Sequence, residues 1–317
     1  TPVHPSILNY IQSIGVGIPP RMRKGIVLPR LQARRNGGAD RRSQKGQQST
    51  KEKRKPSWQP PPPFGPHSLP VRIVGTAATP QEFPKNAALV PEVALAGRSN
   101  VGKSTLLVAL LYAHRDHETA QRPPNMRGRT PHTVKLPKGV KATVSSKPGE
   151  TRQITFYQLE DRTKRRLRLV DLPGYGFAYA KPSEAERYRQ LMSEYLLKRG
   201  KALKRLLLLI DARHGMKKAD SDFLQELQQD RLDLPLQIVL TKCDLVQQSD
   251  LARRVYQVRQ QLSEMLRREP NQLPILLVSA RAGIGYNNVV NDTARGGVLE
   301  LQTELAALVP SQPNKAK

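Results

Sequence analysis

The feature that most constrains this chain is a nine-residue loop pattern between a short apolar run and a helical run. Residues 97–105 read GRSNVGKST, which matches the spacing GxxxxGK[ST], and residues 92–96 before them read as a buried strand. Successive backbone N–H groups of such a glycine-rich turn, aimed together at the start of a helix, bind a phosphate chain without burying a second charge. The pattern therefore predicts a nucleotide site at the end of a strand.

The polar residues of this loop have expected roles. Lys103 would reach the β- and γ-phosphates, and the Ser104 hydroxyl would ligate a Mg²⁺ ion that bridges the same oxygens. A chance match in a glycine-containing turn is the alternative, and the motifs downstream argue against it. The residues from which we expect nucleotide contacts are Gly97, Arg98, Ser99, Asn100, Val101, Gly102, Lys103, Ser104 and Thr105.

A second motif, DLPG at residues 171–174, follows an apolar run. An aspartate at the carboxyl end of a strand can hold Mg²⁺ through water, and the Gly174 N–H can sense the γ-phosphate. Thr151 is the candidate for the mobile threonine that completes the Mg²⁺ shell, and the alternatives are Thr130, Thr133 and Thr143. The expected metal ligands are Ser104, Thr151 and Asp171.

A third motif, TKCD at residues 241–244, also follows an apolar run and would select the base. Asp244 can accept hydrogen bonds from guanine N1–H and N2–H₂, whereas adenine lacks both donors. Lys242 would lie along the base, and Thr241 would tie this loop to the phosphate loop. A solvated strand-end turn is the alternative. Backbone N–H groups toward guanine O6 would come from Ser279, Ala280 and Arg281.

Apolar runs alternate with helical segments from about residue 71, which is typical of an α/β protein with a mostly parallel sheet. Residues 114–150 interrupt this alternation with a long, polar and basic insertion, and loops of that length tend to be functional or disordered. We expect strands at 92–96, 154–159, 167–171, 205–211, 237–241 and 275–279. We expect helices near 103–113, 183–198, 219–229, 249–268 and 297–308.

Charge indicates the class of partner. The chain has 53 Lys and Arg against 26 Asp and Glu, a net charge of +27, which is typical of proteins that bind a polyanion such as RNA. Residues 1–70 hold 13 of these basic residues and only two acidic ones. Their composition is too poor in apolar side chains to bury a core, so we expect an extended or disordered tail in which residues 58–64 form a polyproline linker.

Cysteine content and hydropathy bear on the compartment. The single cysteine, Cys243, excludes an internal disulfide and fits a reducing compartment. The longest aliphatic run, 206–210, is too short to span a bilayer, so we expect a soluble protein with no membrane partner. The chain opens at Thr1, and an arginine-rich, acid-poor start is compatible with import into an organelle.

These motifs, together with PGET at 148–151, DLPGYG at 171–176 and DARHG at 211–215, closely resemble those of the EngB (YihA) GTPases over residues 71–310. The resemblance implies a three-layer P-loop GTPase domain of the TrmE-Era-EngA-EngB-septin-like class, between the tail at 1–70 and a short C-terminal tail at 311–317. It also implies a factor in assembly of the large ribosomal subunit, with rRNA, ribosomal proteins and other assembly factors as partners, and a monomer away from the ribosome.

Departures from the family pattern refine these expectations. Glu150, the length of the 114–150 insertion and the basic tail suggest an organellar member, in the mitochondrial matrix; the cytoplasm of a bacterium or another organelle is the alternative. Tyr175 follows the DLPG glycine where Ras-type enzymes have glutamine, which predicts slow intrinsic hydrolysis. Arg213 and His214 invite a catalytic role, but we expect structural ones.

The groups expected to take part in hydrolysis are Lys103, Asn100, Thr151 and Gly174. Asn100 matches the asparagine that helps hold K⁺ in related potassium-activated GTPases, which predicts K⁺ stimulation; the alternative is that Asn100 only braces the loop. Two other functions stay open. One is a catalytically slow or inactive GTP-bound scaffold on rRNA, and the other is a tRNA-modification GTPase, which the lack of an extra catalytic domain argues against.

Overall fold

The computed structural model describes residues 4–13, 16, 71–86, 88–112, 153–161, 164–175, 182–230, 235–267, 269, 275–280 and 297–310. The insertion at 114–150, most of the tail at 1–70 and the last seven residues lie outside these ranges. Within the described ranges, no helix is long and apolar enough to cross a bilayer.

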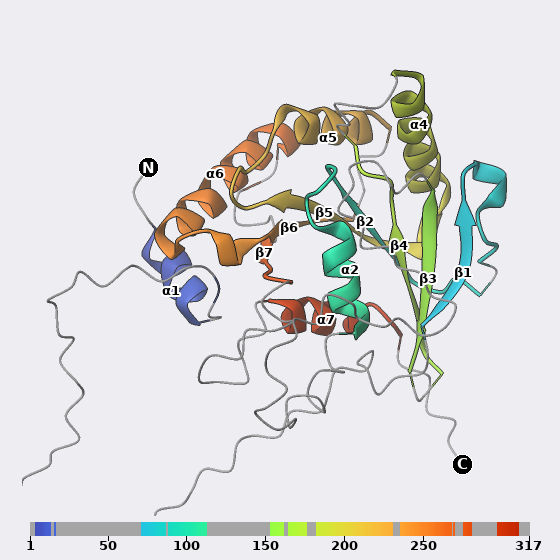
Figure 1. Cartoon of the computed structure of the whole chain (residues 1–317), viewed down its shortest axis with the longest axis horizontal. Coiled ribbons are helices and arrows are strands. Elements are labelled where there is room, and N and C mark those ends of the chain that lie inside the picture. Colours follow the sequence, from blue (N-terminus) through green and yellow to red (C-terminus); the bar gives the residue numbers. More distant parts are fainter. Residues whose placement is uncertain are drawn as a thin grey trace, which may run out of the picture. The chain divides into compact units, whose positions relative to one another are not determined.

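A seven-stranded sheet with the order β1-β3-β4-β2-β5-β6-β7 forms the centre of the described fold (Figure 1). Strands β4, β2, β5, β6 and β7 run parallel, and β3 pairs antiparallel with both β4 and β1. The mostly parallel α/β sheet is therefore confirmed. The strands are β1 (Arg72–Ala77), β2 (Glu92–Gly97), β3 (Ile154–Glu160), β4 (Arg166–Asp171), β5 (Leu203–Asp211), β6 (Leu236–Thr241) and β7 (Ile275–Leu277).

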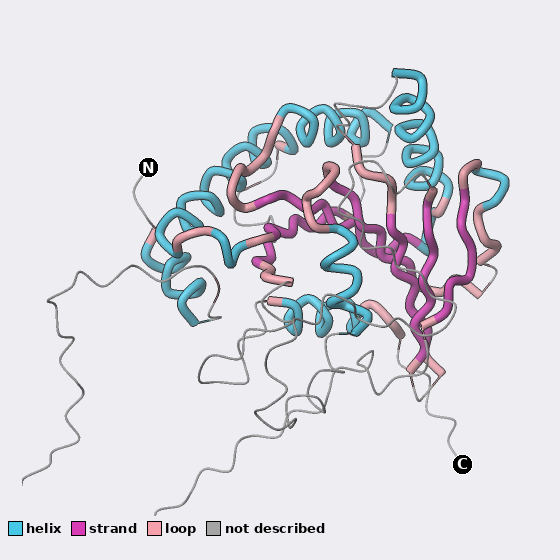
Figure 2. Tube along the Cα trace, viewed as in Figure 1, coloured by secondary structure: helices cyan, strands magenta, loops and turns pink. Residues whose placement is uncertain are grey.

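Helices cover both faces of this sheet, which gives the expected three layers (Figure 2). Alternate residues of β5 point to opposite sides, because successive side chains of a strand do: Leu208 joins the apolar cluster under α4, α5 and α6, and Leu207 joins the cluster under α2 and α7. The helices are α2 (Lys103–Tyr112), α4 (Pro182–Lys198), α5 (Lys218–Asp230), α6 (Gln248–Leu266) and α7 (Val298–Ala307).

Strand β1 is missing from the sequence-based expectation. It lies at the edge of the sheet and is only partly buried, with a register shift between Ile73 and Gly75 where it pairs with β3. The burial of its residues does not alternate and its register is irregular, so the strand gives a weak alternation signal. The six other strands and the five helices expected from the sequence are present, with ends within two residues of those expected.

The expectation that the whole segment 1–70 is extended or disordered is wrong for its first residues. Helix α1 (Pro5–Ser13) packs on α6, and both Ile11 and Val16 are buried in the apolar cluster beneath α6 (Figure 1). The Tyr10 hydroxyl donates hydrogen bonds to the Glu300 carboxylate at 2.9 and 3.0 Å. Composition averaged over 70 residues hid an amphipathic helix of one short segment.

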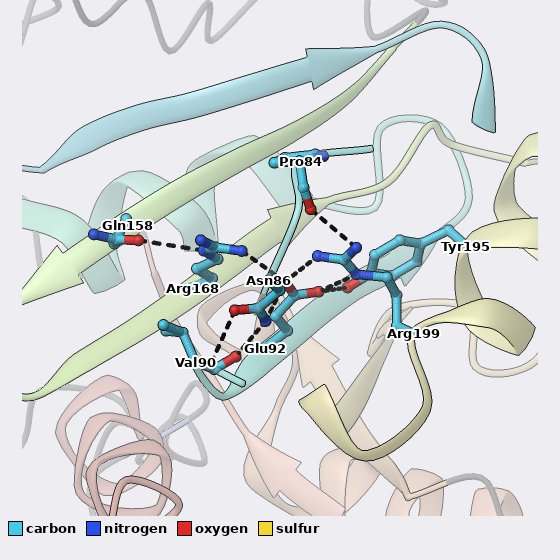
Figure 3. Close-up of polar contacts among 8 residues, drawn as sticks. All are labelled: Pro84, Asn86, Val90, Glu92, Gln158, Arg168, Tyr195 and Arg199. Atoms are coloured by element: carbon cyan, nitrogen blue, oxygen red, sulfur yellow. Dashed lines mark hydrogen bonds and ion pairs between the residues drawn. The ribbon is translucent and has the colours of Figure 1, made fainter. Parts of the chain in front are cut away.

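A buried carboxylate fixes the start of β2 (Figure 3). Glu92 is fully buried and accepts hydrogen bonds from Arg168 of β4 at 3.2 Å and from the Tyr195 hydroxyl of α4 at 3.0 Å. The guanidinium of Arg199, just after α4, donates to both Glu92 oxygens at 2.8 and 2.5 Å, and Asn86 adds a bond of 3.1 Å. The cluster fastens α4 to the central strand at the end opposite Gly97.

Candidate nucleotide-binding site

The phosphate loop joins the end of β2 to the start of α2, as the sequence predicts. Gly97 has φ +155°, and a Cβ there would lie 2.8 Å from the Leu209 carbonyl oxygen of β5, so only glycine fits. Lys103 is the first residue of α2 and is buried, and its Nζ donates to the Gly97 carbonyl oxygen at 3.2 Å. The ammonium group thus turns back over the loop, where the phosphates of a nucleotide would lie. Burial lowers the pKa of Lys103, and the nearby Asp171 carboxylate opposes this shift.

Asp171 ends β4 and pairs in register with Leu95 of β2, so it stands beside the phosphate loop. Burial raises the pKa of Asp171 to about 6, against the opposing effect of the Lys103 ammonium. Its Oδ1 atom is buried and has no hydrogen-bond partner among the described residues. A buried carboxylate oxygen without a donor is costly, and a divalent cation would remove that cost, so Asp171 fits Mg²⁺.

The described residues hold no cluster of three or more His, Cys, Asp or Glu side chains placed for a metal. Mg²⁺ is commonly bound through one or two protein groups together with substrate phosphates and water. Asp171, at the end of β4, and Ser104, at the start of α2, are suited to that type of site. Thr151, the third expected ligand, lies outside the described residues.

The hydroxyl oxygens of Ser99 and Ser279 are also buried and have no hydrogen-bond partner within the part of the chain that the structure describes. Ser99 follows β2, and Ser279 follows β7. The carboxyl ends of parallel strands meet at one edge of the sheet, which is where ligands of such folds bind. The unpaired oxygens of Ser99, Asp171 and Ser279 therefore mark the same edge of the sheet as a polar site.

The base-recognition loop is fastened to the phosphate loop, as expected for Thr241. Its Oγ1 donates to the Val101 carbonyl oxygen at 2.6 Å. Lys242 has the left-handed φ of 56°, and its Nζ donates to the Asn100 carbonyl oxygen at 2.5 Å. Asp244 follows in a short 3-10 turn (Cys243–Leu245) and is partly exposed, so its carboxylate is accessible to a base.

Asp211, to which the sequence analysis gave no separate role, holds this loop in place. It ends β5, pairs in register with Thr241 and contacts Lys242 Nζ through Oδ2 at 2.9 Å. Arg213 binds the same carboxylate, with Nη2 2.7 Å from Oδ2. Burial opposes ionisation of Asp211, but the hydrogen bonds from Arg213 and Lys242 outweigh it and lower its pKa to about 2. The signal was available, since Asp211 follows the β5 apolar run at the same edge as Gly97 and Thr241.

The other expected residues are placed as follows. The Asn100 side chain is exposed, Ser104 and Thr105 lie in the first turn of α2, and Ala280 follows β7. The Arg98 side chain turns to the buried Asp220 of α5, with Nε 3.1 Å from Oδ2. Arg281 lies outside the described residues.

Cys243 is buried and its burial raises the pKa of the thiol, so it offers no reactive thiolate.

Residues 92–242 match the protein-family model described as "50S ribosome-binding GTPase". The chain is 38% identical over 214 residues to a "Probable GTP-binding protein EngB" of Gluconobacter oxydans, a match that covers 67% of this chain and 78% of that relative. It is 37% identical over 208 residues to the protein of the same name from Anaplasma phagocytophilum, covering 65% of this chain and 89% of that relative.

Proposed function

We propose that this chain, which belongs to the EngB family of GTPases, binds GTP and GDP with Mg²⁺ and cycles on and off a precursor of the large ribosomal subunit. The observation that carries the nucleotide assignment is that three motifs far apart in the sequence meet at one sheet edge. Strand β2 leads into the loop that carries Lys103, strand β4 ends at Asp171, and strand β6 ends at Thr241. The Thr241 hydroxyl donates directly to the phosphate loop.

Each group in this site has a defined task. Lys103 and the N–H groups of residues 100–105 would bind the phosphates, and Ser104 and Asp171 would hold Mg²⁺. When bound, Mg²⁺ neutralises charge on the β- and γ-phosphate oxygens. Asp244 would accept the two guanine hydrogen bonds, while Lys242, fixed by Asp211, would lie against the base.

The surroundings of Tyr175 support slow intrinsic hydrolysis. Its hydroxyl donates to Asp220 at 2.8 Å, and its ring stacks on Phe223 with centroids 4.5 Å apart. The side chain is therefore buried against α5 and is not available to orient a water molecule at the γ-phosphate. K⁺ at Asn100 would supply positive charge to the leaving oxygens, and equal hydrolysis rates in K⁺ and Na⁺ would exclude it.

Charge supports the ribosomal part of the proposal. A net charge of +27 suits a protein that docks on rRNA through phosphate contacts, and the matching family model carries the description "50S ribosome-binding GTPase". The partners would be large-subunit rRNA, ribosomal proteins and other assembly factors. The basic residues of the tail further suggest an organellar protein of the mitochondrial matrix, with a bacterial cytoplasm or another organelle as the alternative.

Two measurements test the proposal. Calorimetry should show binding of GTP and GDP and much weaker binding of ATP; equal binding of ATP would refute the base assignment. Sedimentation of the tagged full chain through a sucrose gradient should show co-migration with large-subunit precursors that differs between GDP and a non-hydrolysable GTP analogue. Co-migration that is the same with GDP and with the GTP analogue would favour the alternative of an inactive GTP-bound scaffold.

A further inference from the structure

Asp220 is a fully buried acidic residue in the first turn of α5, outside every nucleotide motif. Its Oδ1 accepts a hydrogen bond from the Tyr175 hydroxyl at 2.8 Å. Its Oδ2 accepts one from the Lys217 backbone N–H at 2.8 Å and lies 3.1 Å from Nε of Arg98. Two of these three partners belong to nucleotide motifs, since Arg98 lies in the phosphate loop and Tyr175 directly follows DLPG.

The backbone of the DLPG segment is also paired with the phosphate loop. Tyr175 and Arg98 form an isolated parallel bridge, in which the Ser99 N–H donates to the Tyr175 carbonyl oxygen at 3.2 Å. The Tyr175 N–H donates in turn to the Gly97 carbonyl oxygen at 3.4 Å. The ring of Tyr175 stacks on Phe223 of α5 with an interplanar angle of 18°. The segment is thus held to the loop by its backbone and to α5 by its side chain.

The backbone of Gly174 lies close to Lys103 and Ser99 in this arrangement. A Cβ on Gly174 would lie 2.9 Å from Lys103 Nζ and 3.0 Å from Ser99 Oγ. A γ-phosphate needs to contact both the lysine and the Gly174 N–H. Because even a single added carbon on Gly174 would crowd Lys103 and Ser99, a γ-phosphate placed between Gly174 and Lys103 would require the DLPG segment to move away from the loop, whereas a diphosphate would place no group there.

We propose that Asp220 is a positioning residue that latches the DLPG segment onto the phosphate loop, and that this latch favours GDP over GTP. The proposal rests on the proposed function, because it concerns the same nucleotide site. Asp220 holds Tyr175 on one oxygen and Arg98 on the other, so the two motifs move apart only when a buried carboxylate loses a partner. Helix α5 thereby opposes binding of the γ-phosphate.

The test uses Tyr175→Phe in the full chain, since this change keeps the ring that stacks on Phe223 and deletes only the hydroxyl. Dissociation constants for Mg²⁺-GDP and for a non-hydrolysable Mg²⁺-GTP analogue are measured by calorimetry. We expect the affinity for the analogue relative to GDP to rise about three- to tenfold, which corresponds to the loss of one typical intramolecular hydrogen bond. Asp220→Asn, which weakens both contacts, should shift the ratio in the same direction.

Tyr195→Phe is the matched control. Tyr195 is also a buried tyrosine whose hydroxyl donates to a buried carboxylate, that of Glu92 at 3.0 Å, but at the opposite end of β2. It should lower the melting temperature as Tyr175→Phe does and leave the ratio of the two nucleotide affinities unchanged.

The possible results separate the two proposals. If the wild-type chain binds neither nucleotide, the proposed function fails. If the wild type binds both, and Tyr175→Phe changes both affinities equally or shifts the ratio toward GDP, the latch is refuted while the proposed function stands. Circular dichroism and the melting temperature of each variant confirm that the compared proteins are folded.

Discussion

Thr241 Oγ1 donates a 2.6 Å hydrogen bond to the carbonyl oxygen of Val101, which lies 140 residues earlier in the chain. This bond connects the loop that would read the base to the loop that would bind the phosphates. Both partners are buried, so the bond is shielded from water. The shape of the phosphate loop therefore depends on a residue of the guanine motif.

Thr241→Val should weaken binding of GTP and GDP together. Valine keeps the volume of threonine but cannot donate, so the Val101 carbonyl loses its partner, at a cost of about 1 kcal/mol or a roughly fivefold loss of affinity. Calorimetry with GDP measures the effect. Thr241→Ser keeps the hydroxyl and should bind close to wild type; a valine variant with wild-type affinity would show that the bond contributes nothing to the loop.

Asp244→Asn should change the preferred base. The amide of asparagine no longer offers two acceptor oxygens to guanine N1–H and N2–H₂, which should weaken GTP binding about 100-fold or more through loss of charged hydrogen bonds. The new NH₂ group can donate to the C2 carbonyl oxygen of xanthine, so XTP should bind better than GTP. A competition experiment measures the relative affinity of the variant for GTP and XTP. A variant that still prefers GTP would show that Asp244 does not recognise the base.

Asp211 should make the fold sensitive to acid. Its pKa is lowered to about 2 in the native state from 3.8, so its contribution is present above pH 4 and is lost as the pH falls toward 2. At neutral pH that contribution is about 2 kcal/mol. Asp211→Asn should lower the free energy of unfolding at pH 7 and flatten its dependence between pH 4 and 2, as urea titrations at each pH will show. Asp250→Asn, on the surface of α6, should not flatten it.

Glu92→Gln should destabilise the protein without altering the nucleotide site. Removing the charge leaves the guanidinium groups of Arg168 and Arg199 without their carboxylate, and breaking such a buried pair costs about 3–5 kcal/mol. Urea denaturation measures the loss, and GDP affinity below the transition should stay at the wild-type value. Glu186→Gln, which removes an exposed pair with Arg189, should have little effect. A large drop in GDP affinity would contradict the separation of the two ends of β2.

Ile11→Ala should show that α1 belongs to the folded domain. Ile11 is fully buried in the cluster beneath α6, and truncating such a side chain costs about 2–5 kcal/mol. The melting temperature of the full-length variant should therefore fall clearly. Asn9→Ala, on the exposed side of the same helix, is the matched control and should melt near the wild type. Equal melting of the Ile11 variant and the wild type would mean that α1 adds no stability.

Much of the site was readable from the sequence because its parts are contiguous. The strand, the phosphate loop and the first turn of α2 follow one another within residues 92–112, and the spacing of Gly97, Gly102 and Lys103 specifies the loop by itself. The five helices and six of the strands were found for a related reason, since their apolar periodicity is local. Edge strand β1 was missed because its alternation is weak, and helix α1 was missed because it is a short segment of a tail that was judged by its overall composition.

The sequence by itself determined that this chain builds an α/β nucleotide-binding fold of the EngB family, with its motifs at the carboxyl ends of parallel strands. Only the tertiary structure decided which distant groups bind one another: Tyr175 with Asp220, 45 residues apart, Lys242 with Asp211, and Glu92 with Arg168 and Arg199. The physical reason is that a buried charge must find its partner across the packed layers, and the choice of partner depends on how helices seat on the sheet rather than on spacing along the chain.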